Sequence, residues 1–291
     1  MSITLEALLH HGTEQLMACD VADADFEASQ LLGYCCNIKA SLLSLYRTQA
    51  VTAEQEEKFQ QLLLQRMQGL PLQYVLGEWD FYGRTFFVDR DVLIPRPETE
   101  ELVDRVLQYV RKNHVATVYD VCGGTGCIGL TVAAECPEIN VYIFELYDAP
   151  LCCIEKNIKL LGLQNVKLLR CDALKPENIS LLPAADVIIS NPPYIPTSEL
   201  PQLQKEVQRE PMTALDGGMD GLVFYRALAS HWYAYLMHGG RMFLECAEGQ
   251  PQEILALFAE ANKDSDGCGS FRDFYGLERF VIIEKEKKGT D

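Results

Sequence analysis

The chain lacks the features that mark membrane, secreted and zinc-binding proteins. No apolar run approaches the ~20 residues that a membrane helix needs. The segment from Met1 to Leu9 carries Glu6 but no lysine or arginine, so it lacks the basic start of a signal peptide. The eleven cysteines form no Cys-x-x-Cys pair, and the histidines show neither a zinc-ligand spacing nor a catalytic arrangement. We therefore expect a cytoplasmic protein with mostly buried, reduced cysteines, no membrane contact and no metal.

The chain is also poor in basic residues, with 25 Lys and Arg against 42 Asp and Glu and a net charge of −17. A surface that follows nucleic-acid phosphates needs clustered lysine and arginine. The only dense basic run is the C-terminal stretch 285–288, which Glu286 interrupts. We expect no direct contact with nucleic acid. A basic protein partner fits the charge better, although solubility alone could also explain it.

Residues 1–75 predict a small helical domain. Thr52-Ala53-Glu54-Gln55 is a capping-box pattern, apolar residues at helical spacing follow it, and Gly69 and Pro71 end the helix. A surface that docks a substrate is the functional interpretation, and a bundle that only braces its neighbour is the alternative. Aromatic and β-branched residues between turn residues then predict a β-hairpin linker over residues 76–95.

Residues 96–291 predict an α/β domain. Apolar strands end at Val121, Glu145, Arg170, Ser190 and Glu245, with helical segments between them. One of those helices is expected over residues 222–237, and two last strands, over residues 271–275 and 279–284, close the chain. This alternation is typical of a mostly parallel sheet covered by helices on both faces, with an antiparallel strand near the end.

A glycine-rich turn after the first strand predicts a nucleotide-type binding loop, since glycines let the backbone approach a ligand closely. Alone the loop is weak support, because a dinucleotide fold or a purely structural turn also uses such glycines. Two acids strengthen it. Glu145 ends the second strand, where a carboxylate can accept from ribose hydroxyls, and Asp172 follows the third strand, where it can accept from an adenine amino group. Either acid alone could equally be a solvated strand-end residue.

The stretch Asn191-Pro192-Pro193-Tyr194 directly follows the apolar run 186–190 and is the most informative motif. Two consecutive prolines stiffen the backbone into an extended turn just past a strand end, where open α/β sheets bind ligands. The Asn191 amide, the Pro192 carbonyl and the Tyr194 ring can together hold a planar NH2 group. The alternative is a rigid turn with a surface tyrosine. Further upstream, Arg96 lies between two prolines, where it faces either an anionic group or solvent.

Together these motifs resemble the class I S-adenosylmethionine-dependent methyltransferases. More narrowly, the chain resembles the HemK/PrmC family, which methylates the glutamine of the Gly-Gly-Gln motif in peptide-chain release factors. The resemblance runs over nearly the whole chain. It rests on Gly77-Glu78, Ile94-Pro95-Arg96-Pro97-Glu98-Thr99-Glu100, Asn191-Pro192-Pro193-Tyr194-Ile195, Glu210-Pro211, Leu244-Glu245, and Arg272-Asp273 to Arg279.

The resemblance implies a Rossmann-like methyltransferase domain over residues 96–291, a monomer, and release factors as partners. The implied reaction moves a methyl group from S-adenosyl-L-methionine to the glutamine N5, leaving S-adenosyl-L-homocysteine. The implied catalytic residues are Asn191, Pro192 and Tyr194, and the substrate-binding residues are these three and Pro193. The implied cofactor-binding residues are Asp120, Cys122, Gly123, Gly124, Thr125, Gly126, Glu145, Asp172, Ala173 and Asn191.

Three positions depart from the family's usual pattern. Cys122 occupies the first glycine position of the loop, and we expect Gly123, one residue later, to supply some of the lost backbone freedom. Glu145 replaces a commoner aspartate, and Glu245-Cys246-Ala247 replaces Glu-Ile-Gly. Two alternatives stay open: an adenine-N6 methyltransferase acting on nucleic acid, which would use the same NH2 clamp, and a docking protein without catalysis, for which Cys122 is the hint.

Overall fold

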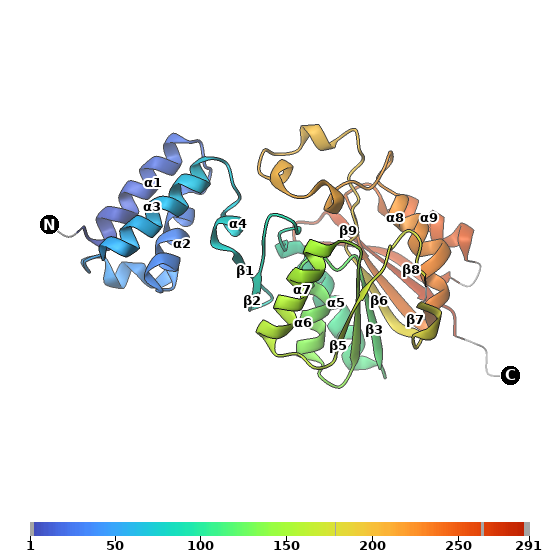
Figure 1. Ribbon diagram of the computed structural model, residues 1–291. Coiled ribbons are helices and arrows are strands. Elements are labelled where there is room, and N and C mark those ends of the chain that lie inside the picture. The colour runs from blue at the N-terminus through green and yellow to red at the C-terminus, as the bar shows by residue number, and fades with distance from the viewer. Residues whose placement is uncertain (1–2, 178, 263–264, 288–291) are drawn as a thin grey trace. The chain divides into compact units, whose positions relative to one another are not determined.

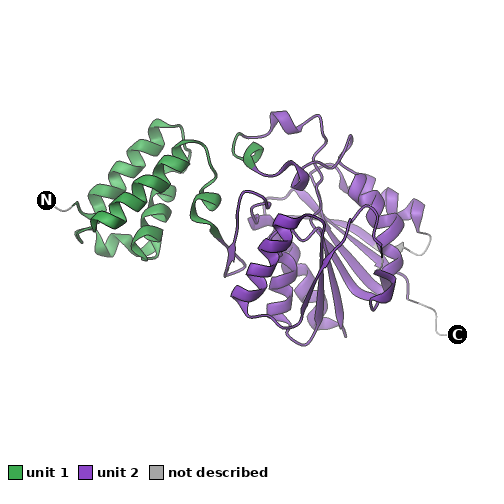
Figure 2. Ribbon diagram, viewed as in Figure 1, with its two compact units in different colours: residues 1–78, 205–209 green, residues 79–204, 210–291 purple. Residues whose placement is uncertain are grey.

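The computed structural model describes residues 3–177, 179–262 and 265–287 (Figure 1). The chain divides into two compact units, residues 1–78 with 205–209 and residues 79–204 with 210–291 (Figure 2).

Unit 1 is helical, as the sequence predicts. Its elements are α1 (Leu5–Ala18), α2 (Ala24–Cys36), the short helix η1 (Ala40–Tyr46), α3 (Ala53–Met67), α4 (Leu72–Leu76) and the turn η4 (Val207–Arg209). The capping box at α3 is confirmed: the Thr52 hydroxyl accepts from the Gln55 N–H at 3.2 Å, and the Gln55 side chain accepts from the Thr52 N–H at 3.0 Å. These two bonds satisfy N–H groups that a helix start leaves without partners.

The core of unit 1 depends on a close approach between α1 and α3. Phe59 is fully buried, and a Cβ atom added at Gly12 would lie 2.5 Å from its ring. Only glycine fits at this position. Nearby, the buried Arg66 pairs with Glu27 and Glu206, so this guanidinium is not left uncompensated in the interior.

The predicted hairpin comprises β1 (Glu78–Phe81) and β2 (Arg84–Phe87). Its two turn residues, Tyr82 and Gly83, both have positive φ, at 52° and 69°. That conformation matches the twist of a two-residue hairpin. The Tyr82 N–H donates to the Glu100 carboxylate at 2.8 Å, which ties the turn to α5 (Pro97–Lys112).

Unit 2 is built on a seven-stranded sheet with the order β5-β4-β3-β6-β7-β9-β8. The strands are β3 (Thr117–Val121), β4 (Asn140–Glu145), β5 (Val166–Arg170), β6 (Ala185–Ser190), β7 (Leu236–Glu245), β8 (Ser265–Arg272) and β9 (Glu278–Lys285). Strands β3 to β7 pair in parallel, and β9 runs antiparallel to both β7 and β8. The predicted fold class, a mostly parallel Rossmann-like sheet with an antiparallel strand near its end, is confirmed.

Helices cover both faces of this sheet (Figure 1). One face packs against α5, α6 (Cys127–Glu135) and α7 (Asp148–Leu161), and the other against α8 (Val223–Ala227) and α9 (Pro251–Ala261). Alternate residues of each strand point to opposite faces, so Val118 belongs to the first core and Tyr119 to the second.

The helix expected over residues 222–237 is shorter than predicted. After α8 the chain forms a short π-helix, η6 (Leu228–Trp232), and then a 3-10 turn, η7 (Tyr233–Tyr235), before β7 begins at Leu236. The Lys285 ammonium donates to the carbonyls of Tyr233 and Leu236 at 3.1 and 3.0 Å. These carbonyls therefore find a partner from β9 instead of a further helical turn. The other short helices are η2 (Ile179–Leu181), η3 (Leu200–Gln202) and η5 (Met212–Ala214).

Candidate active site

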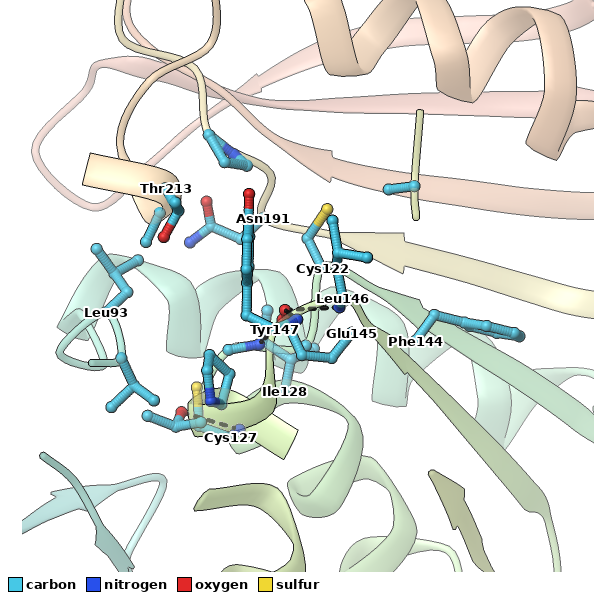
Figure 3. Close-up of a pocket in the computed structure, with 18 of the residues that line it drawn as sticks. Leu93, Cys122, Cys127, Ile128, Phe144, Glu145, Leu146, Tyr147, Asn191 and Thr213 are labelled. Carbon is cyan, nitrogen blue, oxygen red and sulfur yellow. Dashed lines mark hydrogen bonds between the residues drawn. The ribbon is translucent and has the colours of Figure 1, made fainter. Parts of the chain in front are cut away.

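A cavity of about 260 Å³ lies at the carboxyl ends of the parallel strands in unit 2 (Figure 3). Cys122 after β3, Glu145 at the end of β4, Asp172 after β5 and Asn191 after β6 all line it. The sheet order reverses between β3 and β6, and open α/β sheets bind ligands at such a switch point. The cavity therefore collects the residues that the sequence places at four separate strand ends.

The glycine loop between β3 and α6 takes a different conformation from the expected one. Cys122 itself has φ 66°, in the left-handed region, while Gly123 does not have positive φ. The expectation that Gly123 supplies the missing freedom is therefore wrong. Gly123 is needed for another reason: a Cβ atom there would lie 2.4 Å from Ile143 Cγ2. Left-handed backbone at a non-glycine residue costs about 1–2 kcal/mol. The conformation of Cys122 therefore lowers the stability of unit 2 by about this amount.

The Glu145 carboxylate fixes the geometry around the loop. It is 8% exposed, and it accepts from the backbone N–H groups of Gly124 at 3.0 Å, Leu146 at 2.7 Å and Tyr147 at 3.1 Å. A carboxylate offers about four lone-pair directions. Three are used within the chain, and one, on the oxygen that faces Gly124, stays available for a ligand hydroxyl.

Two predicted cofactor residues, Gly126 and Asp120, are buried and absent from the cavity lining. Asp120 is enclosed behind the loop. It does not line the cavity, and one of its oxygens accepts from the Gly129 N–H at 2.8 Å. Its other oxygen meets no hydrogen-bond partner among the described residues. Burial raises its pKa from 3.8 to about 7, against the opposing effect of the Gly129 hydrogen bond. Asp120 thus anchors the first turn of α6 instead of facing a ligand.

Asp172 and Ala173 line the cavity on the β5 side. One Asp172 oxygen accepts from the Leu174 N–H at 2.9 Å, so the side chain holds its own turn in shape. The Ala173 carbonyl accepts from the Trp232 indole N–H at 2.8 Å. Both residues are therefore held by the fold, and Asp172 keeps a second oxygen for an external donor.

The Asn191–Tyr194 turn contributes unevenly to the cavity. Asn191 and Pro193 line it, whereas Pro192 and Tyr194 do not. The turn is clamped from outside: the Gln250 side chain donates to the Tyr194 carbonyl at 2.9 Å, and a Cβ atom at Gly221 would lie 2.3 Å from that same oxygen. Burial raises the pKa of the Tyr194 phenol far above its usual value, so the ring stays neutral. The surface-tyrosine alternative does not describe this turn.

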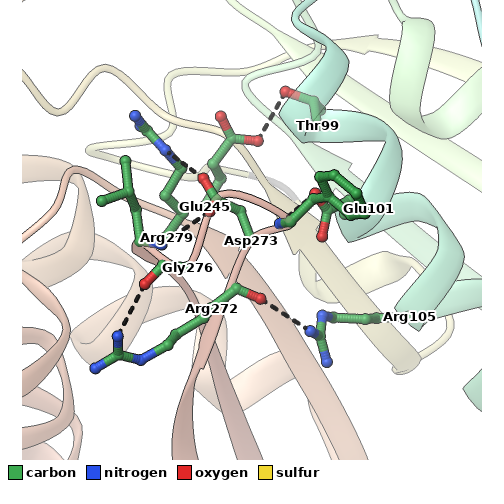
Figure 4. Close-up of polar contacts among 10 residues, drawn as sticks. Thr99, Glu101, Arg105, Glu245, Arg272, Asp273, Gly276 and Arg279 are labelled. Atoms are coloured by element: carbon green, nitrogen blue, oxygen red, sulfur yellow. Dashed lines mark hydrogen bonds and ion pairs between the residues drawn. The ribbon is translucent and has the colours of Figure 1, made fainter.

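Two residues without a role in the sequence interpretation hold the Asn191 side chain. The Asn191 amide nitrogen donates to the Thr99 hydroxyl at 3.3 Å, and that hydroxyl donates to the Glu245 carboxylate at 2.8 Å. Figure 4 shows the bond between Thr99 and Glu245. Thr99 and Glu245 are each 2% exposed, and burial raises the pKa of Glu245 to about 7. The only sequence signal was that both lie in stretches that carry the family resemblance.

Arg96 faces an anionic group of its own chain. It pairs with Glu210, and the Ile94 N–H donates to the same carboxylate at 3.1 Å. Glu210 is almost fully buried and so fixes the stiff Ile94–Arg96 segment along the cavity wall. Thr213 lines the cavity shortly after it in the chain, which gives the site a wall that the sequence did not predict (Figure 3).

The remaining groups at the site limit the chemistry. Burial raises the pKa of the Cys122 thiol well above its usual value, so it stays protonated and is a poor nucleophile. Among the described residues, no group of His, Cys, Asp and Glu side chains is arranged to hold a metal ion. What the site offers is fixed oxygen acceptors around a partly apolar cavity.

No helix in the described part of the chain is long and apolar enough to cross a membrane.

Comparison with known proteins covers both units. Residues 7–77 match the PrmC N-terminal domain, and residues 102–230 match the methyltransferase small domain. A release factor glutamine methyltransferase of Moorella thermoacetica is 36% identical over 293 residues, 98% of this chain and 100% of its own. The enzyme of that name from Thermodesulfovibrio yellowstonii is 34% identical over 267 residues, 90% of this chain and 92% of its own.

A solved structure shows the same fold at low identity. The catalytic domain of hMettl16, determined with an RNA hairpin, has a TM-score of 0.56 and is 14% identical, covering 72% of this chain and 77% of that one. At this identity the likeness concerns the fold alone.

Proposed function

This chain belongs to the family of release factor glutamine methyltransferases, and we propose that it methylates the side-chain amide nitrogen of the glutamine in the Gly-Gly-Gln motif of peptide-chain release factors. The methyl donor is S-adenosyl-L-methionine. The observation that carries the proposal is the position of Asn191, whose amide lies in the same cavity wall as the glycine loop and Glu145. The protein acts in the cytoplasm as a monomer, on protein and not on nucleic acid.

The residues at the cavity fit this cofactor. Gly124 has φ 57° and nothing within 4 Å of where a Cβ atom would lie, so its backbone is open to a ligand. Glu145 has one remaining lone-pair direction for a ribose hydroxyl, and Asp172 can accept from the adenine amino group. Apolar side chains such as Phe144 and Ile128 line the same cavity and suit a flat base. When bound, S-adenosyl-L-methionine supplies an electrophilic sulfonium methyl group.

The proposed task of the Asn191–Tyr194 turn is to prepare a poor nucleophile. A carboxamide nitrogen reacts slowly because its lone pair is delocalised into the carbonyl. The Asn191 oxygen and the Pro192 carbonyl each accept one N–H of the glutamine amide, which orients the lone pair and stabilises the charge that develops on nitrogen. Both neighbours of Pro192 line the cavity, which supports this use of its carbonyl. Tyr194 does not line the cavity, so the expected packing of its ring against the flat amide gains no support from the cavity lining.

Thr99 and Glu245 are the proposed positioning residues for this clamp. Above its pKa of about 7 the Glu245 carboxylate only accepts hydrogen bonds, so it draws the Thr99 proton and leaves a Thr99 lone pair for the Asn191 NH2 group. This arrangement presents the oxygen of Asn191, and not its nitrogen, to the substrate. The clamp needs that orientation because the glutamine NH2 group must find acceptors.

For the parts of the chain, we propose that the helices of residues 1–75 dock the release factor and that residues 96–291 carry the methyltransferase site. Residues 76–95 are the linker that joins these two parts. The match of residues 7–77 to the PrmC N-terminal domain supports a family-specific role for the helices. The relatives are named release factor glutamine methyltransferases. They support neither the hypothesis of an adenine-N6 methyltransferase nor that of a docking protein without catalysis.

The decisive experiment uses purified protein, methyl-labelled S-adenosyl-L-methionine and purified release factors, followed by peptide mass spectrometry. We expect one labelled site, at the side-chain amide of the Gly-Gly-Gln glutamine. A parallel incubation with adenine-containing DNA and RNA is the control. Label on adenine, or cofactor binding without any label on the release factor, would refute the proposed function.

A further inference from the structure

The turn between β8 and β9 exposes two aromatic side chains, Phe274 and Tyr275. The sequence predicts a strand over residues 271–275, but β8 ends at Arg272 and β9 begins at Glu278. Phe274 is 88% and Tyr275 74% exposed, and their rings pack edge to face with centroids 6.1 Å apart. We call this pair the aromatic tip. Two adjacent aromatic side chains left in water lose the free energy that burial would give them.

The backbone beneath the aromatic tip is held rigidly. Asp273 is buried and accepts from the Leu277 N–H and from the Arg279 guanidinium, both at 2.9 Å. Arg272 donates to the Gly276 carbonyl at 2.9 Å, and the Phe274 N–H donates to the Glu101 carboxylate at 2.8 Å. Figure 4 shows several of these contacts around Asp273. An exposed pair on a fixed backbone is pre-organised for binding, because little conformational entropy is lost on contact.

The aromatic tip lies at the same edge of the sheet as the candidate active site. Because β9 runs antiparallel to β7, the turn before β9 emerges where β7 ends, and the register pairs Glu245 with Phe280. The first turn of α5 links the two places: Thr99 donates to Glu245 beside Asn191, and Glu101 accepts from Phe274. Arg279 belongs to both networks, since it bonds Asp273 and its charge partly offsets the rise in the pKa of Glu245 that burial causes.

We propose that the aromatic tip is a docking surface for the release factor, contacting an apolar stretch of the polypeptide that flanks the target glutamine. The inference rests on the proposed function, since it assigns that substrate a second contact beside the Asn191 clamp. A macromolecular substrate must be aligned by contacts outside the reacting group, and exposed aromatic anchors are the side chains that carry such contacts. The occupant is a protein because the tip offers two exposed rings, and the arginines beside it are paired within the chain, Arg272 with Glu278 and Arg279 with Asp273, instead of forming a free cationic cluster that would track phosphates.

The test compares F274A, Y275A and the double variant with the unaltered protein and with L181A. Leu181 is 89% exposed and precedes β6, at the opposite end of the parallel strands from the site. The L181A substitution therefore removes a comparable apolar surface far from the aromatic tip. We expect KM for the intact release factor to rise roughly 10- to 30-fold in the double variant, with kcat and cofactor affinity unchanged and L181A like the unaltered protein. F274L, which keeps an apolar side chain, should retain most of the affinity.

The outcomes separate the inference from the function on which it rests. Direct binding of the release factor is measured by calorimetry beside turnover, so the surface is tested even without methyl transfer. Unchanged KM and Kd in the double variant, with turnover intact in the unaltered protein, would overturn the inference alone. A dimer in light scattering that the double variant abolishes, with KM unchanged, would overturn it in favour of self-association. No turnover in the unaltered protein, with binding weakened in the variants, would refute the function and support the surface.

Discussion

The amide nitrogen of Asn191 lies 3.3 Å from the hydroxyl oxygen of Thr99, and this hydrogen bond gives the two ends of the Asn191 amide different roles. The Thr99 hydroxyl donates its own proton to Glu245 at 2.8 Å, so only its lone pairs face Asn191. The Asn191 nitrogen is thereby used inside the protein, and its oxygen is left for a ligand. The direction of the whole chain of hydrogen bonds follows from a buried carboxylate that accepts and cannot donate when ionised.

Replacing Asn191 by alanine removes the acceptor that this chain of hydrogen bonds orients. We expect kcat for the release factor to fall by about 10²–10³, because a preorganised acceptor at the reacting nitrogen is lost. Cofactor binding by calorimetry and the melting temperature should stay close to those of the unaltered protein. Near-normal turnover of a release factor by this variant would remove Asn191 from the mechanism.

Thr99→Val and Thr99→Ser form a matched pair that tests orientation separately from binding. Valine keeps the shape but cannot accept from Asn191, so the amide is free to rotate, and we expect kcat to fall about 10- to 100-fold with little change in KM. Serine keeps the hydroxyl and should retain most of the activity. Equal activity of the two variants would show that the hydroxyl does not position the clamp.

Cys122→Gly and Cys122→Ala together isolate the backbone strain of the glycine loop between β3 and α6. Both variants remove the sulfur, but only glycine adopts φ 66° without steric cost. We expect the free energy of unfolding of the glycine variant to exceed that of the alanine variant by about 1 kcal/mol in chemical denaturation. The opposite order of stability would mean that the loop relaxes away from the left-handed conformation.

Asp120→Asn tests the buried carboxyl behind the loop through the pH dependence of stability. The pKa of Asp120 is raised from 3.8 to about 7 on folding, so the folded state binds the proton more tightly than the unfolded state. The stabilisation that protonated Asp120 contributes is fully present below about pH 4. Between about pH 4 and 7 the free energy of unfolding then falls by about 1.4 kcal/mol for each pH unit, until this contribution is lost. The unaltered protein should therefore lose stability relative to the asparagine variant between pH 5 and 7.

The measurement for Asp120 is urea denaturation of both proteins at several pH values between about 5 and 8. Glu245, whose pKa is raised in the same direction, is common to both proteins, so its contribution cancels in the difference. A difference in unfolding free energy that does not change with pH would mean that Asp120 ionises normally in the folded state.

Much of the architecture could be predicted because it is encoded locally. The capping box at Thr52, the proline that begins α5 and the strand that leads into Asn191 are all patterns of a few neighbouring residues. The resemblance of such stretches to one family also pointed to the reaction class. The eventual meeting of Cys122, Glu145, Asp172 and Asn191 at one edge follows from parallel strands, whose carboxyl ends all lie on the same side.

Other features depended on contacts between residues that are far apart in the chain. Thr99 is 92 residues from Asn191 and 146 from Glu245, and no local pattern encodes that meeting. The alternating pattern around Phe271 suggests a strand, but the pairing of Arg272 with Glu278 decides where β8 ends and leaves Phe274 and Tyr275 on a turn. Asp120 is the last but one residue of β3 and Glu145 the last of β4, yet only packing decided that the first is enclosed and the second faces the cavity.

The sequence by itself thus determined the order of the elements, the class of fold and the stretch that we propose to hold the substrate NH2 group, because these depend on local patterns along the chain. The tertiary structure decided which way the Asn191 amide faces, which loop residue carries the left-handed strain and which aromatic side chains stay in water. Those properties arise from burial and hydrogen bonding between segments whose meeting is fixed only when the sheet and its helices pack together.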